Sequence, residues 1–543
     1  MFTAKTRPTT KRPFRTTAFV AGALATTLTL AACGGGNTAN NSESPKPSDS
    51  SSAAPAGEVD PNGIIEAGFS YALSGGFDPM ITTGAITVAA NWHTLEGLTE
   101  LDPVTREVYA ALGAELPTKV DDTTYTVKLR EGAVFHDGTP VTVDDVIYSF
   151  ERVLNPDNGS LYAGFIDFVE GVTKVDDTTV QIKTKYAFSL VSERLSVVKI
   201  VPKAYVEANY DAYNALPVGT GPYKMTYAQP DDKITFERFD DYTGSRPAQA
   251  AGMNWNLLSD AAARVTALQS GTVSAIESVP YIDIPGLQAS KKVESVQSFG
   301  LLFMMFNTQK APFDDARVRQ AFFYALDMEK IINTGLLGNA EAATSFLPSS
   351  HPNYKKADTV YTYDPEKAKA LLKEAGVENL SVNLKTTDTD WVADIAPLLK
   401  EDLDAVGLNI TLDIAQSGAQ YAKVDAGDLD VMVAPGDPSV FGNDPDLLMR
   451  WWYDDNVWAQ ARHRWSGAEF DKMQELMDTA VKASGEEQQE SWNEAINLVA
   501  KDVPLYPLLH RKLPTSWDDT QITGFAPIGL TGLSFLDTGV LKK

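Results

Sequence analysis

The sequence has 543 residues, 43% of them hydrophobic and 22% charged, and its formal net charge is −26. Such an acidic chain lacks the basic surface that phosphate contacts need, which excludes nucleic acid as an expected partner. Cys33 is the only cysteine, so no disulfide can form within the chain, and the length predicts two or three domains rather than one core.

The first 32 residues have the pattern of an export signal. Five basic side chains lie within residues 1–15, residues 16–32 carry no charge, and the segment ends in Leu30-Ala31-Ala32-Cys33. A positive head, a short apolar stretch and small residues at the cut predict a secretory signal peptide over 1–32. Leu-Ala-Ala-Cys resembles the lipobox of bacterial lipoproteins, which implies cleavage before Cys33 and a diacylglycerol on its sulfur. The alternative is an ordinary signal peptide with an incidental cysteine.

The composition of the segment after Cys33 predicts a flexible tether. Residues 34–57 contain no Leu, Ile, Val, Phe, Tyr or Trp. A stretch of this composition buries too little apolar surface to fold, so 33–58 is predicted to be a disordered linker spanning roughly 25–30 Å. These features together predict an extracytoplasmic protein that is lipid-anchored to the outer face of the cell membrane.

Strand and helix patterns then alternate along the chain. Residues 64–72 predict a strand, Tyr125, Val127 and Leu129 alternate as in a strand, and 172–183 predict a hairpin turning at Asp176-Asp177. Thr142 and Asp145 resemble a capping box that opens a helix. The apolar stripe of this helix is Val143, Val146, Ile147, Phe150 and Leu154.

The second part of the chain is more regular. Its apolar run 301–307 suits a strand buried on both faces, and the helix after it is expected to begin at Asp314 or Asp315. A further helix has Asp364 as N-cap and Gly376 as its stop. The remaining expected strands are 380–386, 408–414, 429–434 and 503–509, and the remaining helices are 391–405, 468–483 and 487–501. This order predicts an α/β lobe with a largely parallel sheet.

Residue patterns typical of catalysis are missing from the sequence. It has no GxSxG, HExxH or GxxxxGK stretch, its five histidines are isolated, and its Asp-rich loops lack the glycine and glutamate of a calcium loop. The expectation is therefore no enzyme, no cofactor and no metal. A surface hydrolase remains the alternative, because a catalytic carboxylate pair needs no fixed spacing.

Four tryptophans fall close together, at 451, 452, 458 and 465. Two interpretations are open. They pack a local helix against a lobe, or one or two of them line an aromatic pocket. Trp451 is the candidate for the second role.

Several stretches resemble the family 5 extracellular solute-binding proteins, the receptors of peptide and nickel ABC importers. They are LREGAVFHDGTPVTVDDVIYSFERV (129–153), PVGTGPY (217–223), ALQSGTVSAI (267–276), MMFNTQKAPFDDARVRQAFFYALDMEKI (304–331) and YDPEKAKALLKEAG (363–376). Ser274 stands where the family usually has Asp. The blocks occur in the family's order, and the resemblance covers the chain from about residue 64 to its end.

The resemblance implies an α/β, two-lobed, periplasmic-binding-protein-like clamshell of type II, in the large family 5 form with an extra subdomain. Lobe I is expected over 59–298 plus 513–543, with the subdomain at about 96–200, and lobe II over 299–512. The implied function is an ABC importer's substrate-binding lipoprotein, a monomer that delivers short peptides to permease and ATPase subunits. The alternative within the fold is another organic solute: an oligosaccharide, an opine or a metal chelate.

Ligands of open α/β sheets sit beyond the carboxyl ends of the strands. That rule selects Tyr71, Ser74, Asn307, Asp388, Trp391, Asp437 and Phe441 as candidate ligand contacts.

Asp437 raises a separate question. Many peptide binders of the family have an Asp, four residues before the Pro of an Asp-Pro pair, that binds the ligand's α-amino group. Alignment on Asp444-Pro445 puts Phe441 there, whereas Asp437 lies four residues earlier. Either Asp437 takes over the role or the ligand has no amine. Gly436-Asp437-Pro438 is also turn-forming chemistry, which would give Asp437 a purely structural role.

Overall fold

The computed structural model describes residues 57–543 except 74, 161 and 378, and these residues belong to one compact unit. The expected signal peptide, Cys33 and the tether up to residue 56 lie outside the described residues, and so does Ser74. Within the described part of the chain, no helix is long and apolar enough to cross a membrane.

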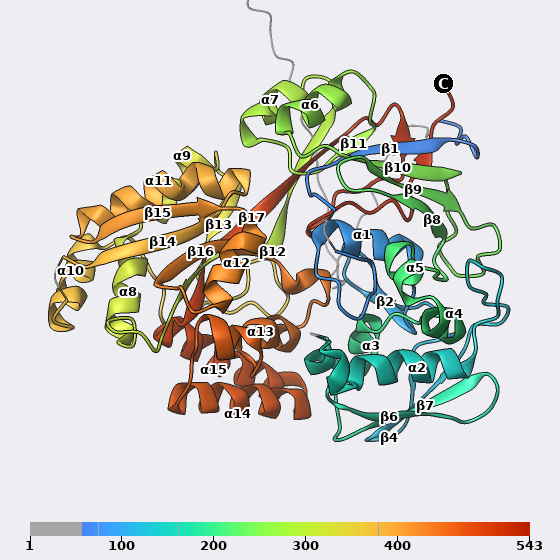
Figure 1. Cartoon of the computed structure of the whole chain (residues 1–543), viewed down its shortest axis with the longest axis horizontal. Helices are drawn as coiled ribbons and strands as arrows, with labels where there is room; N and C mark the ends of the chain where they lie inside the picture. Colours follow the sequence, from blue (N-terminus) through green and yellow to red (C-terminus); the bar gives the residue numbers. More distant parts are fainter. Residues whose placement is uncertain (1–56, 74, 161, 378) are drawn as a thin grey trace, which may run out of the picture. The chain divides into compact units, whose positions relative to one another are not determined.

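Eleven strands of the described residues form one mixed sheet (Figure 1). In spatial order they are β15 (Asn409–Ala415), β14 (Ser381–Thr387), β16 (Val431–Gly436), β12 (Lys292–Phe306), β17 (Leu505–Trp517), β11 (Ala275–Ile276), β1 (Ile64–Phe69), β10 (Gly252–Leu257), β9 (Lys233–Arg238) and β8 (Tyr223–Ala228), with β13 (Ala340–Ala342) paired to β17. The strands from β11 to β8 make up the first half of the sheet, and those from β15 to β12 the second.

The second half confirms the strands expected over 380–386, 408–414 and 429–434, which are β14, β15 and β16. β14 lies between the other two and is parallel to both. β12 is antiparallel to β16, with Leu301 opposite Gly436 and Phe306 opposite Val431. Residues 301–306 are each at most 1% exposed, so this strand is buried on both faces as predicted.

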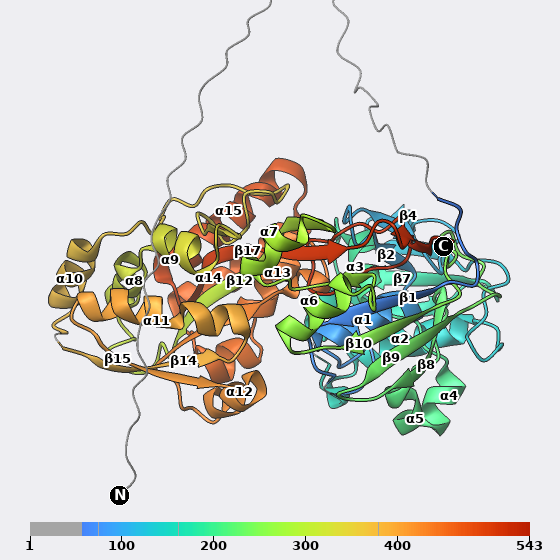
Figure 2. The same ribbon diagram turned by 90° about the horizontal axis from the view of Figure 1, so that it is seen from above.

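Strands β12 and β17 connect the two halves (Figure 2). Ser516 and Trp517 of β17 pair with β11, and β17 also pairs with β12 from Trp517 to Leu505. The pairing is interrupted between Gln297 and Leu301, where the register shifts. β17 also extends eight residues beyond the strand expected over 503–509, to Trp517.

In the first half, β1 is parallel to both β10 and β11. The strand expected over 64–72 is confirmed, but it ends at Phe69, so Tyr71 lies two residues beyond it. Phe69 stacks on Trp255 with ring centroids 4.4 Å apart. The helices that accompany this half are α1 (Ala85–Thr94), α4 (Lys203–Ala208), α5 (Tyr210–Ala215), α6 (Ala261–Gln269) and α7 (Ile284–Leu287).

A separate sheet has the order β4 (Thr118–Asp121), β5 (Thr124–Lys128), β7 (Thr179–Thr184) and β6 (Val169–Lys174). β6 and β7 are the expected hairpin. Beside them, α2 (Val143–Leu154) has the predicted capping box: the Thr142 hydroxyl accepts from Asp145 N, and the Asp145 carboxylate accepts from Thr142 N. The short hairpin of β2 (Thr99–Leu101) and β3 (Val108–Ala110) and the helix α3 (Val191–Arg194) complete this region.

Helices cover the second half. Asp315 caps α8 (Ala316–Ala325) and Asp364 caps α10 (Pro365–Glu374), as the sequence predicts. The others are α9 (Met328–Gly335), α11 (Asp390–Ala405), α12 (Ser417–Asp425), α13 (Pro445–Tyr453), α14 (Ala468–Lys482) and α15 (Gly485–Asp502). A two-stranded sheet of β18 (Ile522–Thr523) and β19 (Gly539–Val540) follows near the C-terminus.

Candidate functional site

Tyr71 and Asp437, two of the predicted site residues, lie near enough for the charge of Asp437 to raise the pKa of Tyr71. Burial raises the pKa of Tyr71 to about 12. The negative charges of Glu277 and Asp437 add to this rise, and the positive charge of Arg511 opposes it. Tyr71 follows β1 in the first half and Asp437 follows β16 in the second, so this phenol faces charges from both halves.

Glu277 and Arg511 are functional candidates that the sequence reasoning missed. Glu277 directly follows β11, whose carboxyl end coincides with that of β1 because the two strands are parallel. Its Oε1 accepts hydrogen bonds from the amide and the hydroxyl of Ser70, both at 3.0 Å. Burial raises the pKa of Glu277, although the charges of Arg264 and Arg511 oppose the rise.

Arg511 lies on β17, and only 6% of its surface is exposed. Its Nε donates to the Tyr281 hydroxyl at 2.8 Å. The guanidinium carbon lies 4.8 Å from the ring centroid of Trp391, a predicted site residue, and 5.8 Å from that of Tyr281. Aromatic rings therefore cover the flat guanidinium and hold its orientation.

Asp437 combines turn chemistry with a long-range contact. Its Oδ1 accepts from the Ser439 amide at 3.2 Å and from the Ser439 hydroxyl. Its Oδ2 accepts from the Thr531 amide at 3.3 Å and the Thr531 hydroxyl at 3.0 Å. Burial raises the pKa of Asp437, and these hydrogen bonds oppose the rise. The carboxylate thus caps the short helix η5 (Pro438–Val440) and ties it to the C-terminal segment.

Arg106 reaches the same place from the turn between β2 and β3. Its Nη2 donates to the Ser439 carbonyl at 2.6 Å. Burial lowers the pKa of Arg106 to about 10, with the charge of Asp437 opposing, so the guanidinium stays charged at neutral pH. Together with Arg264, which interacts with Glu277 and Tyr71, these residues form the central cluster: Tyr71, Arg106, Arg264, Glu277, Asp437 and Arg511.

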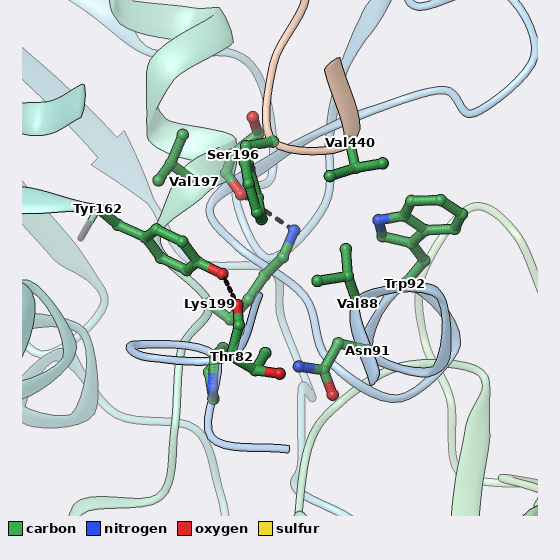
Figure 3. A pocket seen from close by; sticks show the side chains of 11 residues that line it. Thr82, Val88, Asn91, Trp92, Tyr162, Ser196, Val197, Lys199 and Val440 are labelled. Atoms are coloured by element: carbon green, nitrogen blue, oxygen red, sulfur yellow. Dashed lines mark hydrogen bonds between the residues drawn. The ribbon is translucent and has the colours of Figure 1, made fainter. Parts of the chain in front are cut away.

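Phe441 is one of the residues that line a small pocket. Figure 3 shows its other walls, among them Val440, Trp92 and Tyr162. Val440 and Phe441 come from η5 and its end, whereas Asn91, Trp92 and Lys199 come from the N-terminal part of the chain. Its volume of about 50 Å³ is far below the roughly 300–1,000 Å³ of pockets that enclose drug-sized ligands. A ligand as large as a peptide therefore needs these walls to move apart.

The tryptophans divide between the two interpretations. Trp452, Trp458 and Trp465 are at most 5% exposed and belong to the core, which confirms packing as their role. Trp451 is only partly buried and lies 5.2 Å from Phe441 between ring centroids. Trp451 therefore packs against Phe441, which lines the pocket, without lining the pocket itself.

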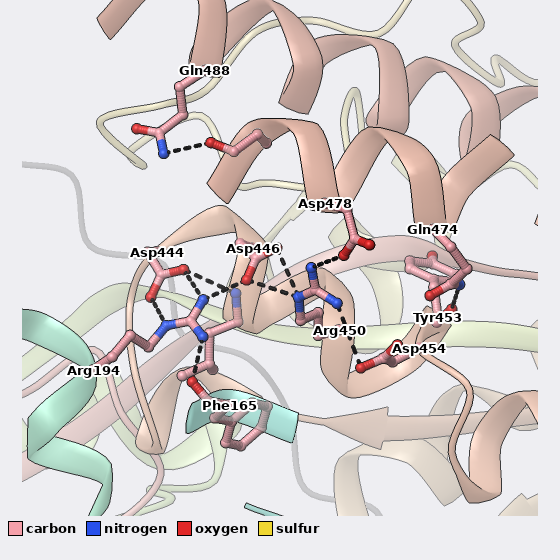
Figure 4. A network of polar contacts seen from close by, with 12 residues as sticks. Phe165, Arg194, Asp444, Asp446, Arg450, Tyr453, Asp454, Gln474, Asp478 and Gln488 are labelled. Atoms are coloured by element: carbon pink, nitrogen blue, oxygen red, sulfur yellow. Dashed lines mark hydrogen bonds and ion pairs between the residues drawn. The ribbon is translucent and has the colours of Figure 1, made fainter. Parts of the chain in front are cut away.

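A buried ion-pair network links α3 to the N-terminus of α13 (Figure 4). Arg194 donates through Nε to Asp444 at 2.8 Å and through Nη2 to Asp444 at 2.6 Å and Asp446 at 2.7 Å. Arg194 is 2% exposed. Its charge lowers the pKa of Asp444 against the effect of burial. This network is a second connection between the N-terminal part of the chain and the second half.

Two of the remaining candidates lie apart from the cluster. Asn307 follows β12 and hydrogen-bonds the Asp430 carbonyl at 3.2 Å, at the start of β16. Because β12 runs antiparallel to β16, Asn307 lies at the opposite edge of the sheet from Asp437. Asp388, after β14, is at the same edge as Asp437 because β14 and β16 are parallel, and its side chain is exposed.

The histidines have structural roles. His93, His136 and His463 each accept a backbone N–H at one ring nitrogen and face a carbonyl with the other, which requires the neutral ring. Burial lowers the pKa of each to about 4. No group of His, Cys, Asp and Glu suited to holding a metal ion occurs in the described part of the chain.

Comparisons with known proteins agree with this architecture. The sequence profile of the bacterial extracellular solute-binding proteins, family 5 Middle, matches residues 107–459. The Dipeptide-binding protein of Escherichia coli (strain K12) is 32% identical over 330 residues, which are 56% of this chain and 62% of that protein. Heme-binding protein A of Haemophilus influenzae is 28% identical over 93% of this chain and 94% of its own length.

Solved structures confirm the predicted fold. The PBP AgaA from A. tumefaciens R10, in complex with agropinic acid, gives a TM-score of 0.79 at 25% identity, covering 89% of this chain and 99% of its own. DppA from Helicobacter pylori, in complex with the peptide STSA, gives 0.79 at 21% identity, covering 89% and 98%. The fold is thus the α/β, two-lobed, periplasmic-binding-protein-like clamshell expected from the sequence.

Proposed function

The chain belongs to the bacterial extracellular solute-binding proteins of family 5, and we propose that it captures short peptides between its two lobes. It then delivers them to the permease of an ABC importer, whose ATPase drives uptake. Relatives named for dipeptide and glutathione binding support a peptide ligand. Because the relatives are solute-binding proteins, the proposed role involves no catalysis.

The presence of acidic and basic groups in the same central cluster supports this proposal. Glu277 Oε2 has no hydrogen-bond partner among the described residues, and neither do Nη1 and Nη2 of Arg511. Both side chains influence the pKa of Tyr71, so they share one neighbourhood. A short peptide is a zwitterion that carries an ammonium for the first group and a carboxylate for the second. Tyr71 and Trp391 are the proposed walls beside these charges.

We place the hinge at the interruption of β12. The register shift between Gln297 and Leu301 lies at the border of the proposed lobe I, 59–298 plus 513–543, and lobe II, 299–512. A break in strand pairing is a site where backbone angles can change without loss of many ladder bonds. Ligand contacts from both lobes would favour the closed state.

A second ligand class has one specific observation in its favour. The neighbour at 25% identity holds agropinic acid, so an opine, and more broadly another organic solute such as an oligosaccharide or a metal chelate, is the alternative ligand. A pure opine binder would ignore tri- to pentapeptides, which separates it from the peptide proposal.

We further propose that the protein works outside the cytoplasm, anchored by lipid on Cys33. The sequence around Cys33 and the tether composition support this, and diacylation supplies the two chains that stable anchoring requires. An anchored receptor stays beside its permease.

Mass spectrometry of what co-purifies with the native protein tests the ligand class directly. We expect tri- to pentapeptides, recovered chemically unchanged after long incubation, and a smaller radius of gyration by small-angle scattering when they are bound. Absence of peptide binding would end the peptide proposal, and a product that accumulates with time would reassign the protein to an enzyme class.

A further inference from the structure

Arginines of this acidic protein are paired with carboxylates almost everywhere. When the described residues alone are considered, all but four of their arginines have a carboxylate oxygen within 4.0 Å. The four are Arg106, Arg264, Arg464 and Arg511. Three of them belong to the central cluster. The unpaired guanidinium groups are therefore concentrated at the junction of the two lobes.

The two acids of the central cluster do not neutralise these arginines by contact. Asp437 accepts all its hydrogen bonds from Ser439 and Thr531, and Glu277 accepts from Ser70. A buried charge without a close partner is costly to hold in a folded protein. An unpaired buried arginine is typical of a binding site, because a ligand of opposite charge offsets its free-energy cost on binding.

Arg511 is the cluster arginine whose two terminal nitrogens, Nη1 and Nη2, both lack a hydrogen-bond partner among the described residues. Arg264 directs Nη1 to two carbonyls and Nη2 to a third, and Arg106 uses Nη2 on the Ser439 carbonyl. Among the described residues, Arg511 donates only through Nε, so Nη1 and Nη2 form an edge that no described acceptor uses. Trp391 covers the face of the guanidinium, and 6% of the residue's surface stays exposed. That edge has the fork geometry that binds both oxygens of a carboxylate.

We propose that Arg511 binds a carboxylate of the ligand through Nη1 and Nη2, and that a free carboxylate is the main requirement for binding. The inference rests on the proposed solute-binding function and defines its ligand class as organic acids. For a peptide, the group is the C-terminal carboxylate. Arg106 and Arg264 add positive charge nearby without direct contact.

The position of Arg511 also explains how such a ligand would promote closure. The Arg511 carbonyl accepts from the Ser298 hydroxyl at 2.7 Å, so the residue faces the interrupted stretch of β12. Its side chain lies against Trp391 of the second half and Tyr281 of the first. A carboxylate on this guanidinium is therefore held beside the hinge, between groups from both lobes.

Calorimetric titration of the mature protein tests the proposal with four probes. They are a tripeptide, its N-acetylated form, its C-terminal amide, and a non-peptide dicarboxylic amino-acid conjugate. We expect the amide to bind at least about 30-fold more weakly than the free acid, as for a desolvated charge pair that loses one partner. Arg511→Met should weaken the free acid by a similar factor and remove the difference between acid and amide.

Two further variants serve as controls for the loss of an arginine and for the loss of the fork geometry. Arg464→Met removes an arginine that also lacks a carboxylate partner but contacts Ala461, outside the cluster, and it should bind all probes like the wild type. Arg511→Lys keeps the charge and loses the fork, so its affinity should fall between the wild type and Arg511→Met. If Arg511→Met does not fold, the acid and amide titrations of the wild type decide alone.

The outcomes distinguish this inference from the proposed function. Equal binding of acid and amide, or full affinity in Arg511→Met, overturns the carboxylate role and leaves peptide binding standing. Binding of the dicarboxylic conjugate but of no peptide, with loss in Arg511→Met, ends the peptide proposal and supports the role of Arg511. If no carboxylate probe binds the wild type, the inference is overturned.

Discussion

Replacing Asp437 by asparagine separates a structural role from ligand binding. The substitution preserves size and one acceptor oxygen but removes the charge. In the structure, the four donors of Ser439 and Thr531 already use the roughly four acceptor positions of the carboxylate. A ligand ammonium could bind Asp437 only by displacing one of them. We therefore expect Asp437 to act as the link between η5 and the C-terminal segment, rather than as the amine-binding group.

The expected magnitudes of the two roles differ widely. An asparagine at 437 leaves the amide or hydroxyl of Thr531 without its acceptor, which should lower the free energy of unfolding by about 1–3 kcal/mol. Affinity should then change by no more than about 3-fold, which is below 1 kcal/mol. Loss of a desolvated ammonium–carboxylate pair would instead weaken binding by about 30-fold to several thousand-fold.

Titrations of Asp437→Asn with free and N-acetylated tripeptides, together with thermal unfolding, measure both effects. Glu277→Gln is the matched variant, because Glu277 has a free oxygen in the same cluster. We expect Asp437→Asn to melt earlier with nearly unchanged affinity, and Glu277→Gln to lose any preference for the free amine. A loss of 30-fold or more in Asp437→Asn, for the free peptide alone, would refute the reasoning. Equal binding of both peptides by the wild type would remove amine pairing from either residue.

Three further outcomes are expected. Arg194→Met should lower the free energy of unfolding in urea by about 3 kcal/mol, since it strands a buried carboxylate. Arg317→Met removes the exposed pair with Asp315 and should change the free energy of unfolding little. Equal losses of stability in the two variants would contradict a difference that comes from burial. Burial lowers the pKa of His93 to about 4, so on acidification the His93 imidazole of the unfolded chain is protonated at a higher pH than that of the folded protein. The contribution of the buried, neutral His93 to stability is complete above pH ~6.5 and is lost as pH falls toward 4. His93→Gln should therefore flatten the melting temperature against pH over that range, and an unchanged slope would count against it. Cys33→Ala should shift the protein from the membrane fraction to unprocessed or released forms, whereas a fully mature, membrane-bound variant would exclude lipidation there.

Local signals explain the elements that could be predicted. The capping box of α2, Asp364 before α10 and the apolar strands β14 to β16 are each encoded within about ten neighbouring residues. The sequence does not say that Asn307 lies at another edge than Asp437, because the direction of β12 depends on its pairing with β16 and no residue within 301–307 records that direction. Strand direction is a tertiary property, so a rule based on carboxyl ends selects residues at both edges: Asp388 and Asp437 at one, and Asn307 at the other.

Arg511 escaped prediction for a different physical reason. The sequence after Leu509 reads His-Arg-Lys-Leu-Pro, which is typical of an exposed turn rather than of a strand. It remains a strand because β12 pairs along it and β13 and β11 add partners over parts of its length. The burial of Arg511 is likewise created by Trp391 and Tyr281, which are distant in sequence. The strand conformation and burial of Arg511 therefore cannot be predicted from the residues next to it in the sequence.

This placement gives the connecting strand a role in recognition as well as in folding. A residue in the interior of either lobe would contact ligand equally well in the open and closed states, and binding there could not shift their populations. Arg511 instead lies on the strand that both lobes share, opposite the interrupted stretch of β12, with an aromatic ring from each side. Separation of the lobes would move Tyr281 of lobe I away from the guanidinium of Arg511 and let water reach its edge, which weakens any carboxylate bound there. The same charge pair is therefore strongest in the closed state, so ligand affinity and lobe closure depend on one residue.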